Sequence, residues 1–268
     1  MCRAEDEGGR RCTDHRQRKA TSIEALRPDP APDRPDVDWA TDRASTPQQL
    51  YADHPAHVAA LVVETMIAAK QQEAAMTADV LAALPEKVRM HGLEFRMKSP
   101  ASLARKLADR VKAAPFAEPE RIVEKITDVV RYTAISRPEQ VVDTARMMAG
   151  SLADRGWTVI EAEQSYLDGN QYKGLHMLAR HPDGLVAEFQ FHTEQSQQVK
   201  DDTHLDYERA RDTGVPVTER AALIEKMTAR WAGVPAPPGL AELSDLGGCP
   251  VTPKNYAPRK MNRGRDAR

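Results

Sequence analysis

The chain is 268 residues long, which allows one domain with extensions or two small domains. Its formal net charge of -2 excludes binding to nucleic acid through overall positive charge, so any basic function must be local. No apolar run approaches the ~20 residues that span a bilayer. The N-terminus lacks the apolar stretch of a secretory signal, and three cysteines do not make a disulfide framework. We therefore expect a cytoplasmic protein with no membrane partner.

The two ends of the chain differ in composition from its middle. Residues 1–47 are polar and rich in proline, which predicts a disordered tail. Three potential zinc ligands lie in this tail without an apparent fourth, so no zinc site is expected; they are Cys2, Cys12 and His15. Residues 48–234 carry helical and strand patterns and are expected to form the folded domain. Residues 235–268 are again proline-rich and end in a basic segment, which predicts a second tail.

The periodicity of apolar residues predicts the elements of the domain. A long helix is expected from Pro47 to Leu84, followed by a short strand over 92–97. Ser99 and Pro100 are expected to start the next helix, because proline fits the first helical turn. The later elements are expected as strand 126–135, helix 138–155, strand 157–162, loop 165–172, helix 195–212 and helix 218–231.

The clearest prediction is a hairpin formed by strands 175–180 and 185–193. The connecting sequence His-Pro-Asp-Gly suits a type I turn that Gly184 completes in the left-handed conformation. Pairing His181 with Leu185 across this turn fixes the register of the two strands. It places Leu178 opposite Glu188 and His176 opposite Gln190.

Alternation along the hairpin separates an apolar face from a polar one. The face expected in the core carries Met177, Ala179, Ala187, Phe189 and Phe191. The other face carries His176, Arg180, Glu188, Gln190 and His192. An acid, an amide, two imidazoles and a guanidinium are a poor choice for packing, so the polar face indicates a site.

A basic run lies between Arg96 and Lys106, where a strand end is expected to meet a helix start. Four cations converge there, namely Arg96, Lys98, Arg105 and Lys106. Backbone N–H groups at a helix N-terminus add partial positive charge. The run therefore predicts a polyphosphate site, although its charge alone would also fit a solvated helix face.

This run resembles the ATP-binding signature of RelA/SpoT-type alarmone synthetases, which transfer pyrophosphate from ATP to the 3′-hydroxyl of a nucleotide. The match has no gap and covers Arg96, Lys98, Ser99, Pro100, Ser102, Arg105 and Lys106. The resemblance implies an ATP site formed by Arg96, Lys98, Ser99, Arg105 and Lys106.

Asp128, in the expected strand 126–135, is similar in position to the magnesium-binding aspartate of that family. The sequence departs from the family next to it, with Arg131 where glycine is usual and Thr133 where arginine is usual. An aspartate on an apolar strand needs a partner. The alternative to a metal site is an ion pair of Asp128 with Arg131 or with a helix residue.

Two later segments resemble the acceptor side of the same enzymes. Asn170, Tyr172, Leu175 and His176 are in step with the family's Asn-Gly-Tyr-Gln-Ser-Leu-His. Glu188, Gln190 and Thr193 are in step with its Glu-x-Gln-x-Arg-Thr, in which His192 replaces arginine. The resemblance implies that Tyr172 stacks on the acceptor base, and that His176, Gln190 and His192 line the acceptor site. It implies that Glu188 acts as the base and holds Mg²⁺ together with Asp128.

Some residues near these segments allow other interpretations. Tyr172 can instead be a loop residue that packs on the sheet, and His204 and Glu208 are expected on a solvated helix face. The acidic segment 161–168 replaces the family's guanine-recognising element, which leaves the acceptor open. The resemblance is spread in family order over residues 92–208.

The resemblance implies an α/β fold of the nucleotidyltransferase type, with a mixed, mostly antiparallel sheet of about five strands flanked by helices. It implies an ATP-dependent pyrophosphokinase that uses Mg²⁺ and makes (p)ppGpp- or (p)ppApp-type alarmones from a purine nucleotide. One alternative is a toxin-type member that modifies the 3′ end of tRNA and has a cognate antitoxin, with the basic C-terminus on RNA phosphates. Another is a catalytically silent nucleotide-binding or protein-interaction module.

Overall fold

The computed structural model describes residues 25–40, 42 and 44–257. The tail residues Cys2, Cys12 and His15 and the basic segment from Arg259 lie outside this range. The chain divides into two compact units. Of the described residues, those up to 77 and those of 93–131 form the first unit, and those of 78–92 and 132–257 form the second. The three divisions fall within helix α3 (Ala56–Ala83), between Gly92 and Leu93, and within strand β2 (Val130–Ile135).

The first unit is largely helical. Its further helices are α2 (Pro47–Asp53), η1 (Leu93–Phe95, a 3₁₀ turn), α4 (Pro100–Ala113) and α5 (Pro119–Glu124). The single long helix expected from Pro47 to Leu84 is broken between α2 and α3. His54 adopts φ -133° and ψ 156° there, because Pro55 disfavours the helical conformation of the residue before it.

Residues 25–40, 42, 44 and 45 belong to the first unit and carry buried side chains, which differs from the disorder expected for this part of the N-terminal tail. Leu26, Val37 and Trp39 are buried, and Nε1 of Trp39 donates a hydrogen bond to the carbonyl oxygen of Met97 at 3.1 Å. These apolar residues follow no regular spacing along the chain. Periodicity therefore gives no signal for their burial, which depends on partners distant in sequence.

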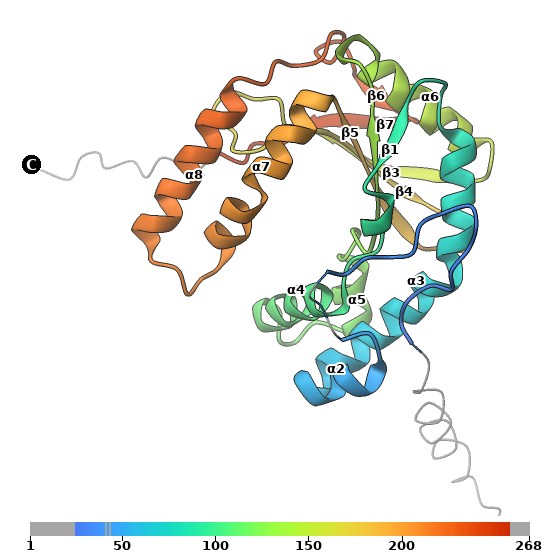
Figure 1. The fold of residues 1–268 in the computed structure, drawn as a ribbon, viewed down its shortest axis with the longest axis vertical. Helices are drawn as coiled ribbons and strands as arrows, with labels where there is room; N and C mark the ends of the chain where they lie inside the picture. The colour runs from blue at the N-terminus through green and yellow to red at the C-terminus, as the bar shows by residue number, and fades with distance from the viewer. Residues whose placement is uncertain (1–24, 41, 43, 258–268) are drawn as a thin grey trace, which may run out of the picture. The chain divides into compact units, whose positions relative to one another are not determined.

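The second unit contains a seven-stranded mixed sheet that is mostly antiparallel and flanked by helices (Figure 1). The first two residues of β2 belong to the first unit. The further strands of the sheet are β1 (Arg89–His91), β3 (Thr158–Gln164), β4 (Leu175–Arg180), β5 (Val186–His192), β6 (Asp245–Leu246) and β7 (Cys249–Pro253). The strand order is β1-β2-β5-β4-β3-β7-β6. The two strands beyond the five expected, β6 and β7, come from residues that the composition assigns to the C-terminal tail. β7 pairs parallel to β3, and β6 pairs antiparallel to β7.

Two of the expected strands are shorter than their sequence patterns. The strand expected over 92–97 is replaced by β1 and η1, because Gly92 turns the chain with a φ of +60°. Met97 keeps a single antiparallel bridge to Val130. The next strand starts only at Val130, so Asp128 precedes the strand in which it was expected.

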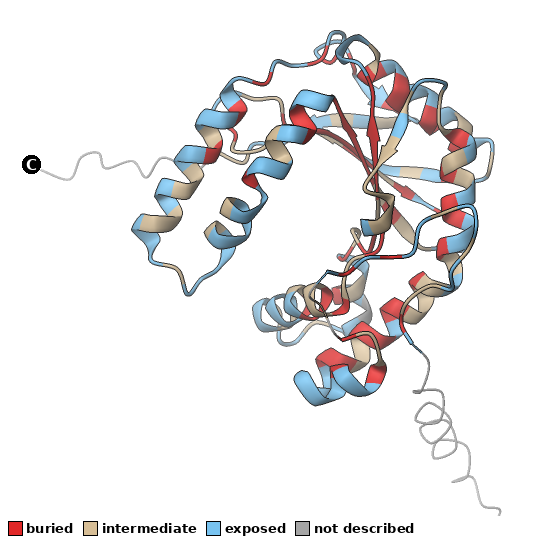
Figure 2. Cartoon of the chain, viewed as in Figure 1, coloured by how far each residue is buried: buried red, intermediate tan, exposed pale blue. Residues whose placement is uncertain are grey.

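Helices α6 (Val141–Ala153), α7 (Glu194–Arg211) and α8 (Val217–Ala232) accompany the sheet, with the 3₁₀ turn η2 (Pro138–Gln140) before α6. α6 packs on β3, β5 and β6, and α7 packs on β5 and on α8. Strands β2, β4 and β5 are largely buried, whereas the outer sides of α7 and α8 face solvent (Figure 2). No helix within residues 25–40, 42 and 44–257 has the length and apolar character needed to cross a membrane.

The predicted hairpin register is confirmed. His176 pairs with Gln190 and Leu178 pairs with Glu188 across β4 and β5. The five residues expected in the core, which are Met177, Ala179, Ala187, Phe189 and Phe191, are all at most 1% exposed. The polar residues of these strands consequently share the opposite face.

Candidate active site

The N-terminus of α4 has the predicted cap. The hydroxyl of Ser99 accepts a hydrogen bond from the backbone N–H of Ser102 at 3.3 Å, and Pro100 occupies the first turn. The N–H of Ala101 donates to Oδ2 of Asp42 at 2.7 Å. The first-turn donors therefore already have protein partners. Any anion site beside this helix start depends on side-chain cations rather than on backbone groups.

Two of the predicted cations converge on Asp128. Nζ of Lys106 lies 2.7 Å from Oδ1 and Nζ of Lys98 lies 3.1 Å from Oδ2. The three side chains are only 19% to 25% exposed. The alternative foreseen for Asp128, an ion pair with a helix residue, is thus present, since Lys106 belongs to α4.

The electrostatics of this cluster favour an additional anion. Burial lowers the pKa of Lys98, and the nearby charges of Arg131 and Lys106 lower it further, against the opposing effect of Asp128. Burial would raise the pKa of Asp128, but the charges and hydrogen bonds of Lys98 and Lys106 outweigh it and lower that pKa to about 2. The single ionised carboxylate of Asp128 therefore faces three neighbouring cations, Lys98, Lys106 and Arg131. The cluster consequently keeps an excess of positive charge.

Arg96 does not join this cluster. It is 2% exposed, and its Nε lies 2.5 Å from Oε1 of the fully buried Glu73. Its Nη1 donates to the carbonyl oxygens of Pro35 and Leu93 at 2.7 and 2.9 Å. Arg96 therefore holds the N-terminal segment and η1 in place. Arg105 is exposed, and its Nη2 donates to the hydroxyl of Ser102 at 3.0 Å.

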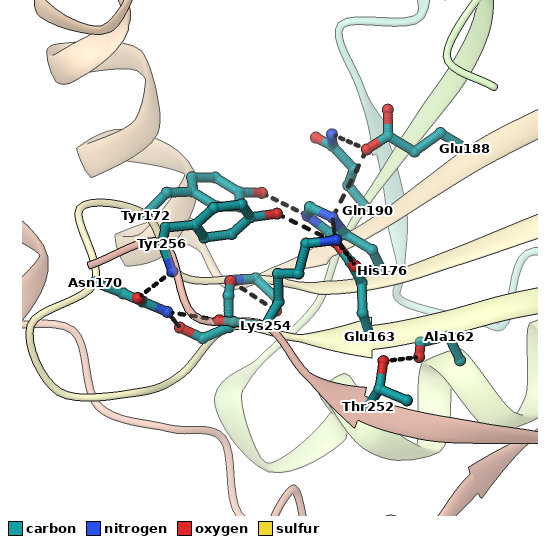
Figure 3. Close-up of polar contacts among 12 residues, drawn as sticks. Ala162, Glu163, Asn170, Tyr172, His176, Glu188, Gln190, Thr252, Lys254 and Tyr256 are labelled. Atoms are coloured by element: carbon teal, nitrogen blue, oxygen red, sulfur yellow. Dashed lines mark hydrogen bonds and ion pairs between the residues drawn. The ribbon is translucent and has the colours of Figure 1, made fainter. Parts of the chain in front are cut away.

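The polar face of the hairpin carries a connected set of side chains around Glu188 (Figure 3). Nε2 of Gln190 donates to Oε1 of Glu188 at 2.9 Å, and Nδ1 of His176 lies 3.7 Å from the same oxygen. Nζ of Lys200, on α7, donates to Oε1 of Gln190 at 2.5 Å. Both contacts of Glu188 use Oε1. Its Oε2 has no hydrogen bond or ion pair with any residue that the structure describes.

Tyr172 links the two imidazoles of this face. Its hydroxyl lies 2.7 Å from Nε2 of His176 and 3.0 Å from Nε2 of His192, which is fully buried. Its ring packs edge-on against Trp231 with 5.1 Å between centroids. The ring also lies edge-on to Tyr256, with 6.2 Å between centroids. Packing on the fold, the alternative foreseen for Tyr172, is therefore present for both its hydroxyl and its ring. His204 and Glu208 are exposed, in agreement with the solvated helix face that was expected.

Sequence reasoning missed Glu163 as part of this face. It lies on β3 opposite His176, and its carboxylate contacts three side chains, as Figure 3 shows. They are His176 Nδ1 at 3.7 Å, Lys254 Nζ at 2.9 Å and the hydroxyl of Tyr256 at 3.2 Å. A register shift between Val159 and Glu161 decides which residues of β3 share this face. Simple alternation does not foresee the shift, although the acids of 161–168 were a usable signal.

The charge on Glu163 follows from its partners. The neighbouring imidazole of His176 lowers its pKa most, burial acts in the opposite direction, and Lys254 lowers the pKa further, to about 2. Burial and the neighbouring charge of Glu163 raise the pKa of Tyr256. At neutral pH the face therefore carries an ionised Glu163 and a neutral Tyr256.

The described side chains do not fit a protein-held metal ion. Both oxygens of Asp128 accept from lysine ammonium groups. Among the described residues, no group of three or more His, Cys, Asp or Glu side chains is placed to hold a metal. The magnesium role that the resemblance implies for Asp128 and Glu188 stays a prediction.

No protein-family model matches the chain, and no curated protein matches it. Among solved structures it is similar to small alarmone synthetase 1 from Bacillus subtilis, at 16% identity over 62% of this chain and 88% of that one, with a TM-score of 0.41. It is similar to the Type VI effector Tas1, solved with its immunity protein, at 19% identity over 62% and 91% with a TM-score of 0.38. A GTP pyrophosphokinase family protein from Streptococcus pneumoniae gives 15% identity over 69% and 86% with a TM-score of 0.37.

The comparison thus finds alarmone synthetases, the class of enzyme that the motifs resemble. Identities below 20% and TM-scores below 0.5 carry no argument for activity or family membership. The activity of the chain must therefore be inferred from its own residues and from their contacts.

Proposed function

We propose that the chain is an ATP-dependent pyrophosphokinase that acts on the 3′-hydroxyl of a purine nucleotide. The observation that carries the proposal is Oε2 of Glu188, on the polar face of the sheet, which makes no hydrogen bond or ion pair with a described residue. A half-buried carboxylate with one oxygen held and the other open is suited to take a proton from a hydroxyl group.

The triphosphate of ATP is assigned to Lys98, Lys106 and Arg105. Lys98 and Lys106 are held by Asp128 and remain partly exposed, and their cluster keeps an excess of positive charge. Charge-assisted hydrogen bonds to phosphate oxygens would compete with Asp128 for the two ammonium groups. Ser99 contributes by capping α4, and Arg96 is left out of the proposed ATP site because its guanidinium is already bound inside the protein.

The reaction is an in-line displacement at the β-phosphorus of ATP. The 3′-oxygen of the acceptor forms a bond to this phosphorus, the bond from the phosphorus to the α–β bridging oxygen breaks, and AMP leaves. The proton of the hydroxyl passes to Oε2 of Glu188. Tyr172 is proposed to stack on the acceptor base, as the resemblance implies, and His176, Gln190 and His192 fix the surroundings of Glu188. Mg²⁺ is proposed to arrive with ATP, because in such enzymes it keeps several waters and is bound by the substrate phosphates together with one or two carboxylates.

The acceptor is proposed to extend beyond GDP and GTP. The acidic residues of 161–168 stand where the resembled enzymes recognise guanine, and stacking on an aromatic ring does not by itself select guanine over adenine. Glu163, within this segment, already has protein partners rather than a free edge for guanine.

The test is incubation of the full chain with γ-³²P-ATP and equal amounts of GDP, GTP, ADP or ATP as acceptor, with bulk tRNA in a parallel reaction. We expect label on guanine and adenine nucleotides, and a loss of at least ~10²-fold in Glu188→Gln, the low end for general base catalysis. Label confined to GDP and GTP would restrict the acceptor to guanine. Label on tRNA alone would replace the proposal by the toxin-type activity, and no label on any acceptor would refute pyrophosphate transfer.

A further inference from the structure

The sheet face beside Glu188 carries a second acid, Glu163, that the proposed reaction does not use. Its side chain is 13% exposed and is held from three sides. His176 approaches it from the neighbouring strand, and Lys254 and Tyr256 approach it from the C-terminal segment after β7. Because long side chains lose rotamer freedom in such contacts, this arrangement fixes the carboxylate in one place.

The imidazole of His176 is shared between the two acids. Its Nδ1 lies 3.7 Å from Oε1 of Glu163 and 3.7 Å from Oε1 of Glu188. Its Nε2 lies 2.7 Å from the hydroxyl of Tyr172. Each ring nitrogen of His176 therefore has a partner. Rotation of the imidazole about χ1 or χ2 would break the contacts of both nitrogens.

We propose that Glu163 is a positioning residue of the pyrophosphate transfer: it holds His176 so that Nδ1 faces Oε1 of Glu188 and leaves Oε2 open to the acceptor. This inference rests on the proposed function of Glu188. Glu163 itself touches no reacting atom in this scheme and acts only through the imidazole.

The C-terminal segment supports this role. Asn170 is 1% exposed, and its amide holds the segment while its Nδ2 also donates to the carbonyl oxygen of Ser165 at 2.8 Å. Its Oδ1 accepts from the N–H groups of Tyr256 and Ala257 at 2.7 and 3.0 Å, and its Nδ2 donates to the carbonyl oxygen of Lys254 at 2.9 Å. This clamp brings Lys254 and Tyr256 onto Glu163 (Figure 3). The acid beside His176 is thus fixed by residues about 90 positions away in the chain.

Loss of the charge at Glu163 would leave Glu188 as the only acid facing Nδ1 of His176 among the described residues. The imidazole would then be drawn toward Glu188, and the orientation of that carboxylate would change while the lysines that bind ATP stay as they are. The expected kinetic signature is a lower kcat with an unchanged KM for ATP.

The experiment compares Glu163→Gln and Glu163→Asp with the matched control Thr252→Ala, which alters the residue paired with Glu163 across β3 and β7. We expect kcat to fall ~10- to 100-fold in Glu163→Gln, the scale of a lost interaction with a charged group. Glu163→Asp keeps the charge and should recover part of this loss. The second readout is the ¹⁵N chemical shifts of the His176 ring in selectively labelled protein, assigned with His176→Gln. These shifts should change in both Glu163 variants and stay as in the wild type in Thr252→Ala.

Wild-type kcat together with unchanged His176 shifts in folded Glu163→Gln would overturn the positioning role. If Glu163→Gln does not fold, the same pair of results in Glu163→Asp overturns it. If the wild type transfers pyrophosphate to no acceptor while the His176 shifts respond to Glu163, the contact stands and the proposed function fails. The shifts therefore separate the failure of one inference from the failure of the other.

Discussion

The hydroxyl of Tyr172 lies 2.7 Å from Nε2 of His176, and Gly174 lies directly beside this contact. A β-carbon placed at Gly174 would be 2.7 Å from both of these atoms. The residue between the loop and β4 must therefore lack a side chain for the two groups to meet. This contact connects Tyr172, which is proposed to stack on the acceptor base, with His176, whose imidazole faces Glu188.

Gly174→Ala is expected to separate Tyr172 from His176 and to lower both stability and transfer activity. Overpacking of this kind costs typically ~1–3 kcal/mol. The matched control is Gly150→Ala in α6, where an added β-carbon meets no atom within 4 Å and a helix favours alanine by roughly 0.5–1 kcal/mol. Thermal unfolding and transfer kinetics of both variants check this. Equal behaviour of the two variants would mean that the Tyr172–His176 contact is dispensable.

Lys98→Ala and Lys106→Ala are each expected to reduce kcat/KM for ATP while the protein stays folded. Asp128 keeps one lysine in either single variant, so no buried carboxylate is left without a cation. A lost charge-assisted hydrogen bond to phosphate is worth ~1.5–3 kcal/mol of transition-state binding. Lys112→Ala, an exposed change in the last turn of α4, is the control. Wild-type kinetics for ATP in both variants would contradict the ATP site and would favour the interpretation of the basic run as a solvated helix face.

The stability of the protein is expected to depend on Asp128 in acid. The pKa of Asp128 is about 2 in the folded chain, below its ordinary value of 3.8. The ionised carboxylate therefore stabilises the fold above about pH 4, and this contribution disappears as the pH falls through 2. Since one pKa unit corresponds to 1.36 kcal/mol, its full size is about 2 kcal/mol.

Urea unfolding of the wild type and Asp128→Asn at several pH values between 2 and 5 measures this contribution. The difference in unfolding free energy between the two proteins should shrink as the pH falls from about 4 to about 2. Glu163 titrates in the same range in both proteins, so its effect cancels in the difference. A difference that stays constant over this range would show that the two lysines do not stabilise the ionised carboxylate.

Removal of residues 1–45 is expected to destabilise the protein strongly. The composition of this segment predicts a dispensable tail, but Leu26, Val37 and Trp39 are buried and Arg34 pairs with Glu73. Loss of one large buried aromatic side chain alone costs ~3–5 kcal/mol. The melting temperature of this truncation should fall well below that of a protein lacking only residues 1–24, which lie outside the described range. Equal melting temperatures of the two truncations would refute this prediction.

Several features of the chain follow from local rules and could be predicted without the fold. The His-Pro-Asp-Gly turn between β4 and β5 fixed their register, because a tight loop leaves only one pairing. That register is enough to place His176, Glu188 and Gln190 on one face of the hairpin. Ser99 and Pro100 set the start of α4 in the same way, through a side-chain cap and a preset backbone angle.

The partners of the site residues, in contrast, depend on how distant segments of the chain pack together. The placement of Glu163 depends on a register shift within β3, and its contact with Lys254 joins residues 91 positions apart. The burial of Trp39 and Arg96 depends likewise on distant segments. Such contacts form because a buried apolar or charged group is stabilised only by partners that lie far from it in the sequence. No periodicity or local propensity encodes the choice of these partners, since its free energy appears only when the whole fold is assembled.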